Sequence, residues 1–362
     1  MLVPTDSLVQ SVPPRMPAFF NPRARLNRDL AVIASAAHVA NFGGPHTLLD
    51  CLAGLGARGL RIACEVPSVS RVTINDANPQ AIAMAQESAR MNGLDNIETS
   101  EDEACRFLAG FARRNHRGGI VDIDPFGSPA EFIDCGIRAT AHGGMLAVTA
   151  TDLQVLNGLA QDACKRRYGG TTIKTTYSDE LALRLIIGCI RGVAGRLDAG
   201  IQPLFVHADQ HYYRVYVRIL NCRDTTSNLG HIFHCSCGAR GVATSCMKTC
   251  PRCGSDVILA GPMWIKDLFE REFVEDMRDM ADSHTVSTRC RTILEKCVKE
   301  CGMPPTYYTL DEVASSIKRS PPKLCHALQK LEGAGFRASP TSFNPTGFRT
   351  SARVADIEEA MR

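Results

Sequence analysis

The order of hydrophobic and polar positions predicts strands that alternate with helices through the first half of the chain. Apolar runs near residues 46–50, 71–76 and 121–124, and a further strand ending near residue 100, are each followed by a stretch with helical spacing. Alternating strands and helices favour a parallel sheet, whose carboxyl ends lie along one edge. Ligands of open α/β sheets bind at that edge. We therefore expect an α/β fold with a site built from these strand ends.

The second half of the chain predicts smaller elements. Two β-rich runs, residues 201–209 and 212–220, flank a tight turn and indicate an antiparallel hairpin that closes the sheet. Residues 264–280 are expected to form a helix. A capped amphipathic helix over residues 309–317, a second helix over about residues 323–332 and a short strand indicate a winged-helix-like unit. A helical packing module without a nucleic-acid role is the alternative.

The strand that ends near residue 124 carries the most informative chemistry. Asp124 and the carbonyl of Pro125 can each accept a hydrogen bond from an exocyclic amine, and Phe126 can stack on a flat ring. This combination points to methylation of an amino group on a nucleobase. An ordinary turn is the alternative interpretation, because Pro125 and Gly127 are common turn formers.

A glycine-bearing loop follows the first strand. Gly54, Gly56 and Gly59 allow the backbone to approach a ligand closely, although their spacing differs from the dinucleotide-binding fingerprint. About twenty residues later, Asp76 is placed to accept both hydroxyls of a ribose. Its alternative role is a helix N-cap, which Asn78 fills better.

The third strand end again carries acids. Asp102 or Glu103 can accept from an adenine amine, with the amide of Ala104 meeting a ring nitrogen. Acids in the first turn of a helix also suit its dipole, which is the alternative explanation. Acids at four successive strand ends, Asp50 and Asp124 among them, favour the ligand role.

Several motifs match one known family. They are FFNPRARLNRD (19–29), LDCLAGLGARGLR (49–61), ND (75–76), DIDPFGSP (122–129), VTATD (148–152) and GPMW (261–264). Together they resemble the tRNA guanine-26 dimethyltransferase family, most closely its compact archaeal form. The resemblance implies a class I, Rossmann-like fold that uses S-adenosylmethionine. It also implies transfer of two methyl groups to the exocyclic amine of one guanine in tRNA.

The resemblance assigns roles by position. It places five residues at the methyl donor: Arg28, Arg58, Asp76, Glu103 and Ala104. Asp50 and Asp102 complete the expected cofactor-binding set from the strand-end pattern. Asp124 becomes the catalytic acceptor with Pro125 beside it, and Phe126 and Phe19 are expected to enclose the guanine.

Sixteen cysteines stand out in the composition. No secretory signal or membrane-length apolar run is visible, so we expect a cytoplasmic protein whose thiols stay reduced. One cluster in a strand-poor segment has metal-ligand spacing and predicts a structural zinc site: Cys235, Cys237, Cys250 and Cys253. His234 or Cys246 are alternative ligands, and free surface thiols are the alternative to a metal site.

The formal net charge is only +3, so affinity for nucleic acid must come from local patches. The sequence has three basic clusters, although any one of them is also compatible with a solvated helix face. The clusters are Arg113-Arg114 with Arg117, Lys165-Arg166-Arg167 before Tyr168, and Lys318-Arg319 with Lys323. Together they favour an extended polyanion, and we expect tRNA as the partner of a monomeric protein that binds no membrane.

The expected architecture has three parts. A class I methyltransferase domain spans residues 1–225, with a Pro-rich lead-in over its first sixteen residues. A small zinc-binding insertion spans residues 226–262, and a C-terminal α+β, winged-helix-like domain that binds tRNA spans 263–362. Two other functions fit the motifs. One is amino methylation of another base, such as guanine in rRNA or adenine in DNA. The other is a zinc-bearing nucleic-acid regulator.

Overall fold

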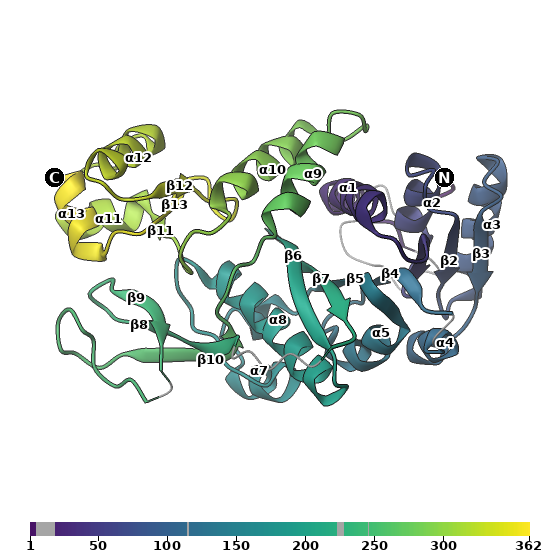
Figure 1. Ribbon diagram of the computed structural model, residues 1–362, viewed down its shortest axis with the longest axis horizontal. Coiled ribbons are helices and arrows are strands. Elements are labelled where there is room, and N and C mark those ends of the chain that lie inside the picture. Colours follow the sequence, from purple (N-terminus) through teal and green to yellow (C-terminus); the bar gives the residue numbers. More distant parts are fainter. Residues whose placement is uncertain (5–18, 114–115, 223–227, 245) are drawn as a thin grey trace.

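The computed structural model describes residues 1–4, 19–113, 116–222, 228–244 and 246–362 (Figure 1). Most of the Pro-rich lead-in and Arg114 of the first basic cluster lie outside these residues.

A seven-stranded sheet forms the centre of the molecule, in the order β3-β2-β1-β4-β5-β7-β6. Strands β1 to β5 are parallel, and β7 runs antiparallel to both β5 and β6. Their bounds are β1 Thr47–Asp50, β2 Arg71–Asn75, β3 Ile97–Ser100, β4 Gly118–Ile123, β5 Thr140–Ala150, β6 Gly200–Asp209 and β7 Tyr212–Leu220. The predicted α/β class and the closing hairpin are confirmed. Every residue of β4 is buried, and Asp122 is the one charged residue in this otherwise apolar central strand.

Two groups of helices cover the sheet (Figure 1). In the first, α1 contacts α2, α9 and α10, and α2 contacts α3. The bounds are α1 Arg25–Asn41, α2 Ala57–Glu65, α3 Pro79–Met91, α9 Arg271–Met280 and α10 Thr288–Glu300. In the second, α5 contacts both α4 and α8, and α7 also packs on α8. These helices are α4 Ala104–Phe111, α5 Ile133–Ala139, α6 Leu153–Leu156, α7 Gln161–Tyr168 and α8 Ser178–Arg196.

The longest apolar stretch of the sequence forms α8, which packs against β6, β7 and β10. Two of its charged residues, Glu180 and Arg184, are buried and paired with each other, so they remain compatible with a core helix. Within the described ranges, no helix is long and apolar enough to cross a membrane.

The cysteine lobe, residues 229–264, was expected to be poor in strands, and this expectation was wrong. It contains a three-stranded antiparallel sheet of β8 (Leu229–His234), β9 (Arg240–Ala243) and β10 (Ile258–Trp264). The predicted helix over residues 264–280 therefore begins later, at Arg271. Trp264 pairs with Leu229 as the last residue of β10, and its indole donates to the carbonyl of Asp267 at 2.9 Å.

The C-terminal subdomain, residues 308–361, has the predicted order of two helices followed by a strand. Its elements are β11 Tyr308–Thr309, α11 Leu310–Ile317, α12 Leu324–Gly333, β12 Ala338–Pro340, β13 Gly347–Thr350 and α13 Val354–Met361. The expected helix cap is present, because the Thr309 hydroxyl accepts from the Glu312 amide and the Glu312 carboxylate accepts from the Thr309 amide.

The apolar side chains form two main cores that do not follow the order of the chain. Phe273 of α9 and Leu294 of α10 belong to the core of the large sheet. Phe233 and Cys235 of the cysteine lobe instead pack with the C-terminal subdomain, including Phe348. Consequently the cysteine lobe and the C-terminal subdomain lie side by side as one unit (Figure 1).

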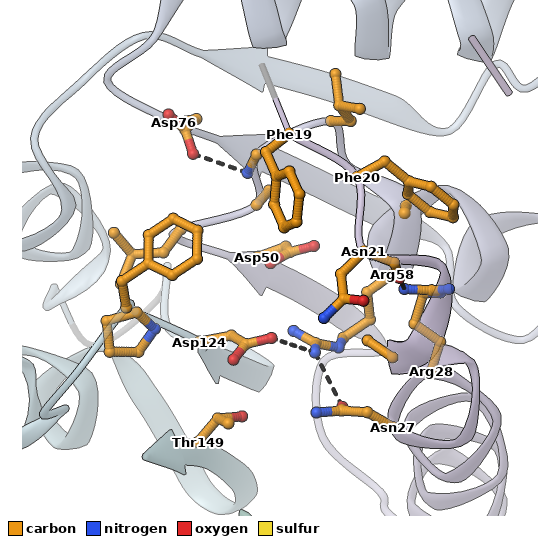
Figure 2. A pocket seen from close by; sticks show the side chains of 18 of the residues that line it. Phe19, Phe20, Asn21, Asn27, Arg28, Asp50, Arg58, Asp76, Asp124 and Thr149 are labelled. Atoms are coloured by element: carbon orange, nitrogen blue, oxygen red, sulfur yellow. Dashed lines mark hydrogen bonds and ion pairs between the residues drawn. The ribbon is translucent and has the colours of Figure 1, made fainter. Parts of the chain in front are cut away.

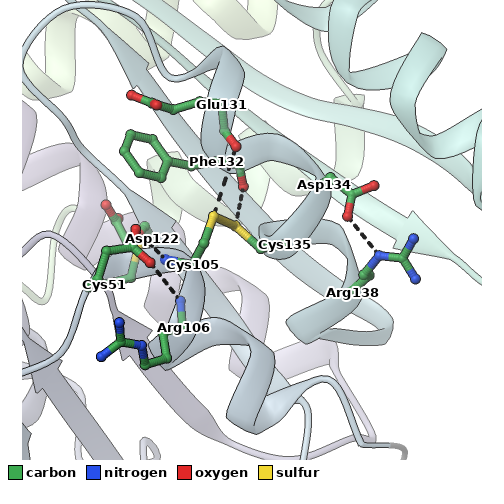
Figure 3. The surroundings of a disulfide bond; sticks show 10 residues. Cys51, Cys105, Arg106, Asp122, Glu131, Phe132, Asp134, Cys135 and Arg138 are labelled. Carbon is green, nitrogen blue, oxygen red and sulfur yellow. Dashed lines mark hydrogen bonds and ion pairs between the residues drawn. A yellow bond between two sulfur atoms is a disulfide. The ribbon is translucent and has the colours of Figure 1, made fainter.

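One pair of cysteines departs from the expectation of reduced thiols. Cys105 on α4 and Cys135 on α5 form a disulfide (Figure 3). They are 30 positions apart in the sequence, and the packing of α4 on α5 brings their Cα atoms to 5.6 Å. Because this contact is tertiary, the cysteine spacing does not reveal it. The other fourteen cysteines are free.

Candidate active site

A cavity of about 420 Å³ opens at the carboxyl ends of β1, β2 and β4 (Figure 2). Eight of the predicted site residues line it: Phe19, Arg28, Asp50, Arg58, Asp76, Asp124, Pro125 and Phe126. Asp102, Glu103 and Ala104 do not. The cavity has the size of a small-molecule site and lies where α/β sheets bind their ligands.

The loop after β1 is shaped by glycine and fastened by Asp76. Gly54 and Gly56 have φ angles of 53° and 69°, which L-residues with side chains rarely adopt. One Asp76 oxygen accepts from the Gly54 amide at 2.7 Å, and the other accepts from the Asn78 amide at 3.0 Å. The Asn78 side chain caps α3 by accepting from the Gln80 amide, so Asp76 is not the cap and faces the pocket.

The acids at the third strand end serve the start of α4. Glu103 accepts from the amides of Cys105 and Arg106 at 3.0 and 2.9 Å, and these bonds lower the pKa of its carboxyl. Asp102 forms an ion pair with Arg106 at 3.2 Å. Asn75 holds this strand end next to the pocket. Its side chain donates to the carbonyl of Asp102 at 3.0 Å and accepts from the Asp102 amide at 3.1 Å.

Asp124 lies against a buried cation. Figure 2 shows the side chains of Asp124 and Asn27 converging on Arg58, which donates to both. Arg58 also donates to Asp122 at 2.8 Å. Burial alone would raise the pKa of Asp124, but Arg58 and then Arg214 outweigh it, so its pKa is lowered. Asp124 is therefore an ionised acceptor at neutral pH.

Asp50 contributes an acceptor without a partner. Its carboxylate is 1% exposed, and one oxygen accepts from the Gly59 amide of α2 at 3.2 Å. The other oxygen, Oδ1, is buried and has no hydrogen-bond partner in the described part of the chain. Burial and then the neighbouring Asp122 raise the pKa of Asp50 to about 7. A buried acceptor of this kind is satisfied only by a bound group or a proton.

Arg28 contributes a cation without a carboxylate. It donates to the carbonyl of Asn21 at 3.0 Å, and its guanidinium lies 4.7 Å from the centre of the Phe20 ring. Among the residues that the structure describes, no carboxylate pairs with it. Burial and then Arg58 and Arg61 lower the pKa of Arg28 to about 10. The pocket thus offers one site for an anionic group and one for a cationic group.

Several residues of the site were missed by the sequence analysis. Asn27 and Asp122 lie within the motifs quoted above, but no role was given to them. Thr149 at the end of β5 and His211 after β6 line the cavity. Arg214 lies in the strand sequence YYRVYVRIL and is 1% exposed. The one signal that could have revealed Arg214 is a charged residue between aromatic and β-branched neighbours, because such a residue needs a buried partner.

The four predicted zinc ligands lie together in the cysteine lobe. The sulfur atoms of Cys235, Cys237, Cys250 and Cys253 all lie within 4.8 Å of one another. Two of the S···S distances are 3.5 and 3.7 Å, close to the roughly 3.8 Å of tetrahedral zinc with Zn–S bonds of about 2.3 Å. The donor set and geometry therefore fit a structural zinc ion.

Two tight turns produce this arrangement. The Gly238 amide donates to the carbonyl of Cys235, and the Gly254 amide donates to that of Cys250, each at 2.9 Å. Both glycines have a positive φ, which closes a cysteine knuckle. The alternative ligands do not join the cluster. The Nδ1 atom of His234 instead hydrogen-bonds the Tyr177 hydroxyl at 3.0 Å.

The protein-family model described as N2,N2-dimethylguanosine tRNA methyltransferase matches residues 2–362 of the chain. The chain belongs to this family.

Individual members of the N2,N2-dimethylguanosine tRNA methyltransferase family agree. The tRNA (guanine(26)-N(2))-dimethyltransferase of Methanothermobacter thermautotrophicus is 35% identical, over 96% of this chain and 93% of the relative. The enzyme of the same name from Saccharolobus solfataricus is 32% identical, over 99% of this chain and 95% of the relative. The solved complex of Trm1 from Pyrococcus horikoshii with S-adenosyl-L-methionine has a TM-score of 0.85 and 28% identity, covering 96% of both chains.

Proposed function

We propose that this protein transfers methyl groups from S-adenosylmethionine to the exocyclic amine of guanine 26 in tRNA, giving mono- and then dimethylguanosine. One observation carries the proposal. The Asp124-Pro125-Phe126 unit and the cofactor-type residues Asp50 and Asp76 line the same cavity. A recognition site for an amine-bearing base and a cradle for a nucleoside therefore share one space, as group transfer requires.

The polar groups of the pocket match the chemical parts of the proposed donor. We assign its carboxylate to Arg28, which lacks an acidic partner among the described residues, and its ribose hydroxyls to Asp76. Asp50 supplies a buried acceptor for the cationic part. We place the adenine beyond Asp76, at Asp102, Glu103 and Ala104. The support for this placement is that β3 adjoins β2 and that Asn75 ties the two strand ends together.

The position of Arg58 suggests a different role from that implied by the family resemblance. Arg58 is 8% exposed and divides its guanidinium among Asp122, Asp124 and Asn27. We propose that Arg58 binds and orients the acceptor carboxylate of Asp124, although it also lines the cavity proposed for the donor.

Two aromatic side chains fit the flipped guanine. Phe126 is 79% exposed, and Phe19 lines the same cavity. An exposed aromatic ring at a pocket mouth has little structural reason to exist, and stacking on a base is worth about 1–3 kcal/mol. That gain offsets much of the few kcal/mol needed to take a base out of its stack.

The side chains then perform the remaining steps. When bound, the sulfonium donor supplies an electrophilic methyl group. Asp124 and the Pro125 carbonyl accept hydrogen bonds from the two N–H groups of the amine, which turns the nitrogen lone pair toward the methyl. As the nitrogen gains positive charge, the Asp124 carboxylate stabilises it and accepts the proton that the methylated amine releases. Arg58 keeps that carboxylate ionised before the reaction.

Of the basic clusters, we place the one on helix α7 closest to the reacting groups. The Tyr168 hydroxyl donates to Asp152 at 2.7 Å and accepts from the Ser128 hydroxyl at 3.0 Å, which joins α7 to the loop of Asp124. Lys165 and Arg166 are exposed on this helix. We propose that they contact phosphates near the target nucleotide, and that the C-terminal subdomain binds the tRNA body.

We further propose that the protein acts as a monomer in the cytoplasm.

The direct test is transfer of labelled methyl to unmodified tRNA, followed by mass analysis of nucleosides. The matched control is the same tRNA with adenine in place of guanine 26. We expect mono- and dimethylguanosine only with guanine 26, and a steep loss of binding as salt rises. Methylation of the control tRNA, of rRNA or of DNA instead would refute the assigned substrate.

A further inference from the structure

Arg214 is a buried arginine that has no role in the mechanism proposed above. It lies on β7 with 1% of its surface exposed, and it does not line the cavity. A buried charge persists only with partners, because its transfer from water is strongly unfavourable. Arg214 pairs with Asp122, donates to the Thr149 hydroxyl at 2.6 Å and donates to the Tyr216 hydroxyl at 2.7 Å.

These contacts continue to the reacting end of the pocket. Asp122 binds Arg214 mainly through Oδ2 and accepts from Arg58 through Oδ1 at 2.8 Å. Arg58 in turn forms the ion pair with Asp124. Four side chains of alternating sign thus run from β7 through β4 and α2 to the acceptor carboxylate. Only the last of them, Asp124, belongs to the unit that we assign to the amine.

We propose that Arg214 is a positioning residue for methyl transfer, which through Asp122 and Arg58 holds the Asp124 carboxylate ionised and in place. The inference rests on the proposed function of Asp124. It assigns a role in the reaction to a strand that closes the sheet and carries no recognised motif. Asn27 accepts at 3.0 Å from the same Nη2 of Arg58 that binds Asp124, and Nη1 binds Asp122, so Arg58 has a defined position as long as Asp122 is itself neutralised.

The charge balance around Asp124 shows why Arg214 matters. The groups that face it are Arg58 from α2, Arg214 from β7, Arg28 from α1, Asp122 on β4, Asp50 at the end of β1 and Thr149 on β5. Without Arg214, Asp122 has only Arg58 as a close cation and competes with Asp124 for it. Asp124 then protonates at a higher pH than in the intact protein.

The test compares Arg214→Met and Arg214→Lys with Arg218→Met as the matched control. Arg218 lies on the same strand but pairs with Glu270, away from the cavity. For Arg214→Met we expect the acid limb of the kcat profile to move up by at least about one pH unit, which is a tenfold change in ionised fraction. The loss of kcat is therefore larger at pH 5.5 than at pH 8. Donor affinity stays within about threefold.

Further outcomes complete the test. Arg214→Lys, which keeps the charge, and Arg218→Met should leave the acid limb where it is in the wild-type protein. If Arg214→Met does not fold, Tyr216→Phe replaces it, because it removes one contact of Arg214 through a side chain that does not line the cavity, and it should give a smaller shift in the same direction. An unmoved acid limb in a folded, active variant overturns the inference. Absence of methyl transfer by the wild-type protein instead overturns the proposed function.

Discussion

The pocket and the junction between α8 and the C-terminal subdomain both contain buried arginines and carboxylates. At the junction, Arg349 of β13 pairs with Glu180 at 3.0 Å and with Glu300 at 2.7 Å. Arg184 also donates to Glu180, and the Thr341 hydroxyl donates to Glu300 at 2.7 Å. At the pocket, the corresponding chain of charges ends at Asp124.

The two clusters differ in what their last groups face. At the junction, the Glu300 oxygens accept from Ser342, Thr341 and Arg349, so the chain itself satisfies them. At the pocket, one oxygen of Asp50 lacks a partner among the described residues, and Asp124 lines a cavity. The pKa of Asp124 and that of Glu180 are both lowered despite burial. A lowered pKa is therefore shared by a structural carboxylate and by the one that we propose to be reactive, and the cavity distinguishes them.

The largest effect is expected outside both clusters, from removing zinc. The cysteine lobe shares its core with the C-terminal subdomain, and Arg252 pairs with Glu358 across them at 2.6 Å. Structural zinc contributes on the order of 10 kcal/mol to folding. We expect chelation to expose amides of β8 and α13 to hydrogen exchange while the large sheet stays protected. Metal-free protein with unchanged exchange, or elemental analysis that finds no zinc, would contradict this.

Arg349→Met tests the structural side of the comparison. It leaves Glu180 and Glu300 buried without their shared cation, which costs about 3–5 kcal/mol of unfolding free energy. Urea unfolding measures that loss, with the exposed Arg71→Met as the control. The turnover of the folded fraction should stay within a few-fold of wild type. A selective loss of turnover at full stability would break the comparison.

Asp124→Asn tests the reactive side. The amide keeps the shape of the side chain but removes the charge that stabilises the methylated amine, so we expect kcat to fall by about 10²-fold or more. Single-turnover methyl transfer gives this value, and calorimetry should find donor affinity within a few-fold of wild type. Turnover close to that of the wild-type protein would remove Asp124 from the chemistry.

Phe126→Ala sharpens the division between donor and base within the pocket. Losing a stacked base contact of about 1–3 kcal/mol should lower kcat/KM for tRNA by about tenfold. Donor affinity should not change, since Phe126 is 79% exposed at the mouth of the cavity. Phe126→Tyr, which keeps a stacking ring, is the matched variant. Equal losses for tRNA and donor would argue against stacking on the base.

The smallest expected effect is a pH dependence of donor binding. Burial and then Asp122 raise the pKa of Asp50 to about 7, so Asp50 is protonated below that pH and charged above it. A cationic donor favours the charged form, and its affinity should rise by up to about tenfold between pH 6 and pH 8. S-adenosylhomocysteine, which lacks the sulfonium charge, should respond less. An identical pH response in Asp50→Asn would show that another group is responsible.

Much of the fold and part of the site could be predicted from local patterns. Alternating apolar runs indicated the parallel strands, and the Thr309–Glu312 cap was visible in the sequence. The cysteine spacing identified all four proposed zinc ligands. The strands of the cysteine lobe were missed because glycine in all three of them, and Pro262 in β10, interrupt their apolar pattern. The helix expected from Trp264 starts late because β10 extends through that residue.

The sequence by itself determined the elements, the strand ends and the chemical types that lie there, because these depend on near neighbours in the chain. The tertiary structure decided which charges meet. Arg58 and Asp124 are 66 residues apart, and Arg214 and Asp122 are 92 apart. Cys105 reaches Cys135 only when α4 packs on α5. Long-range pairing depends on how the sheet places its strands, and no local pattern encodes that placement.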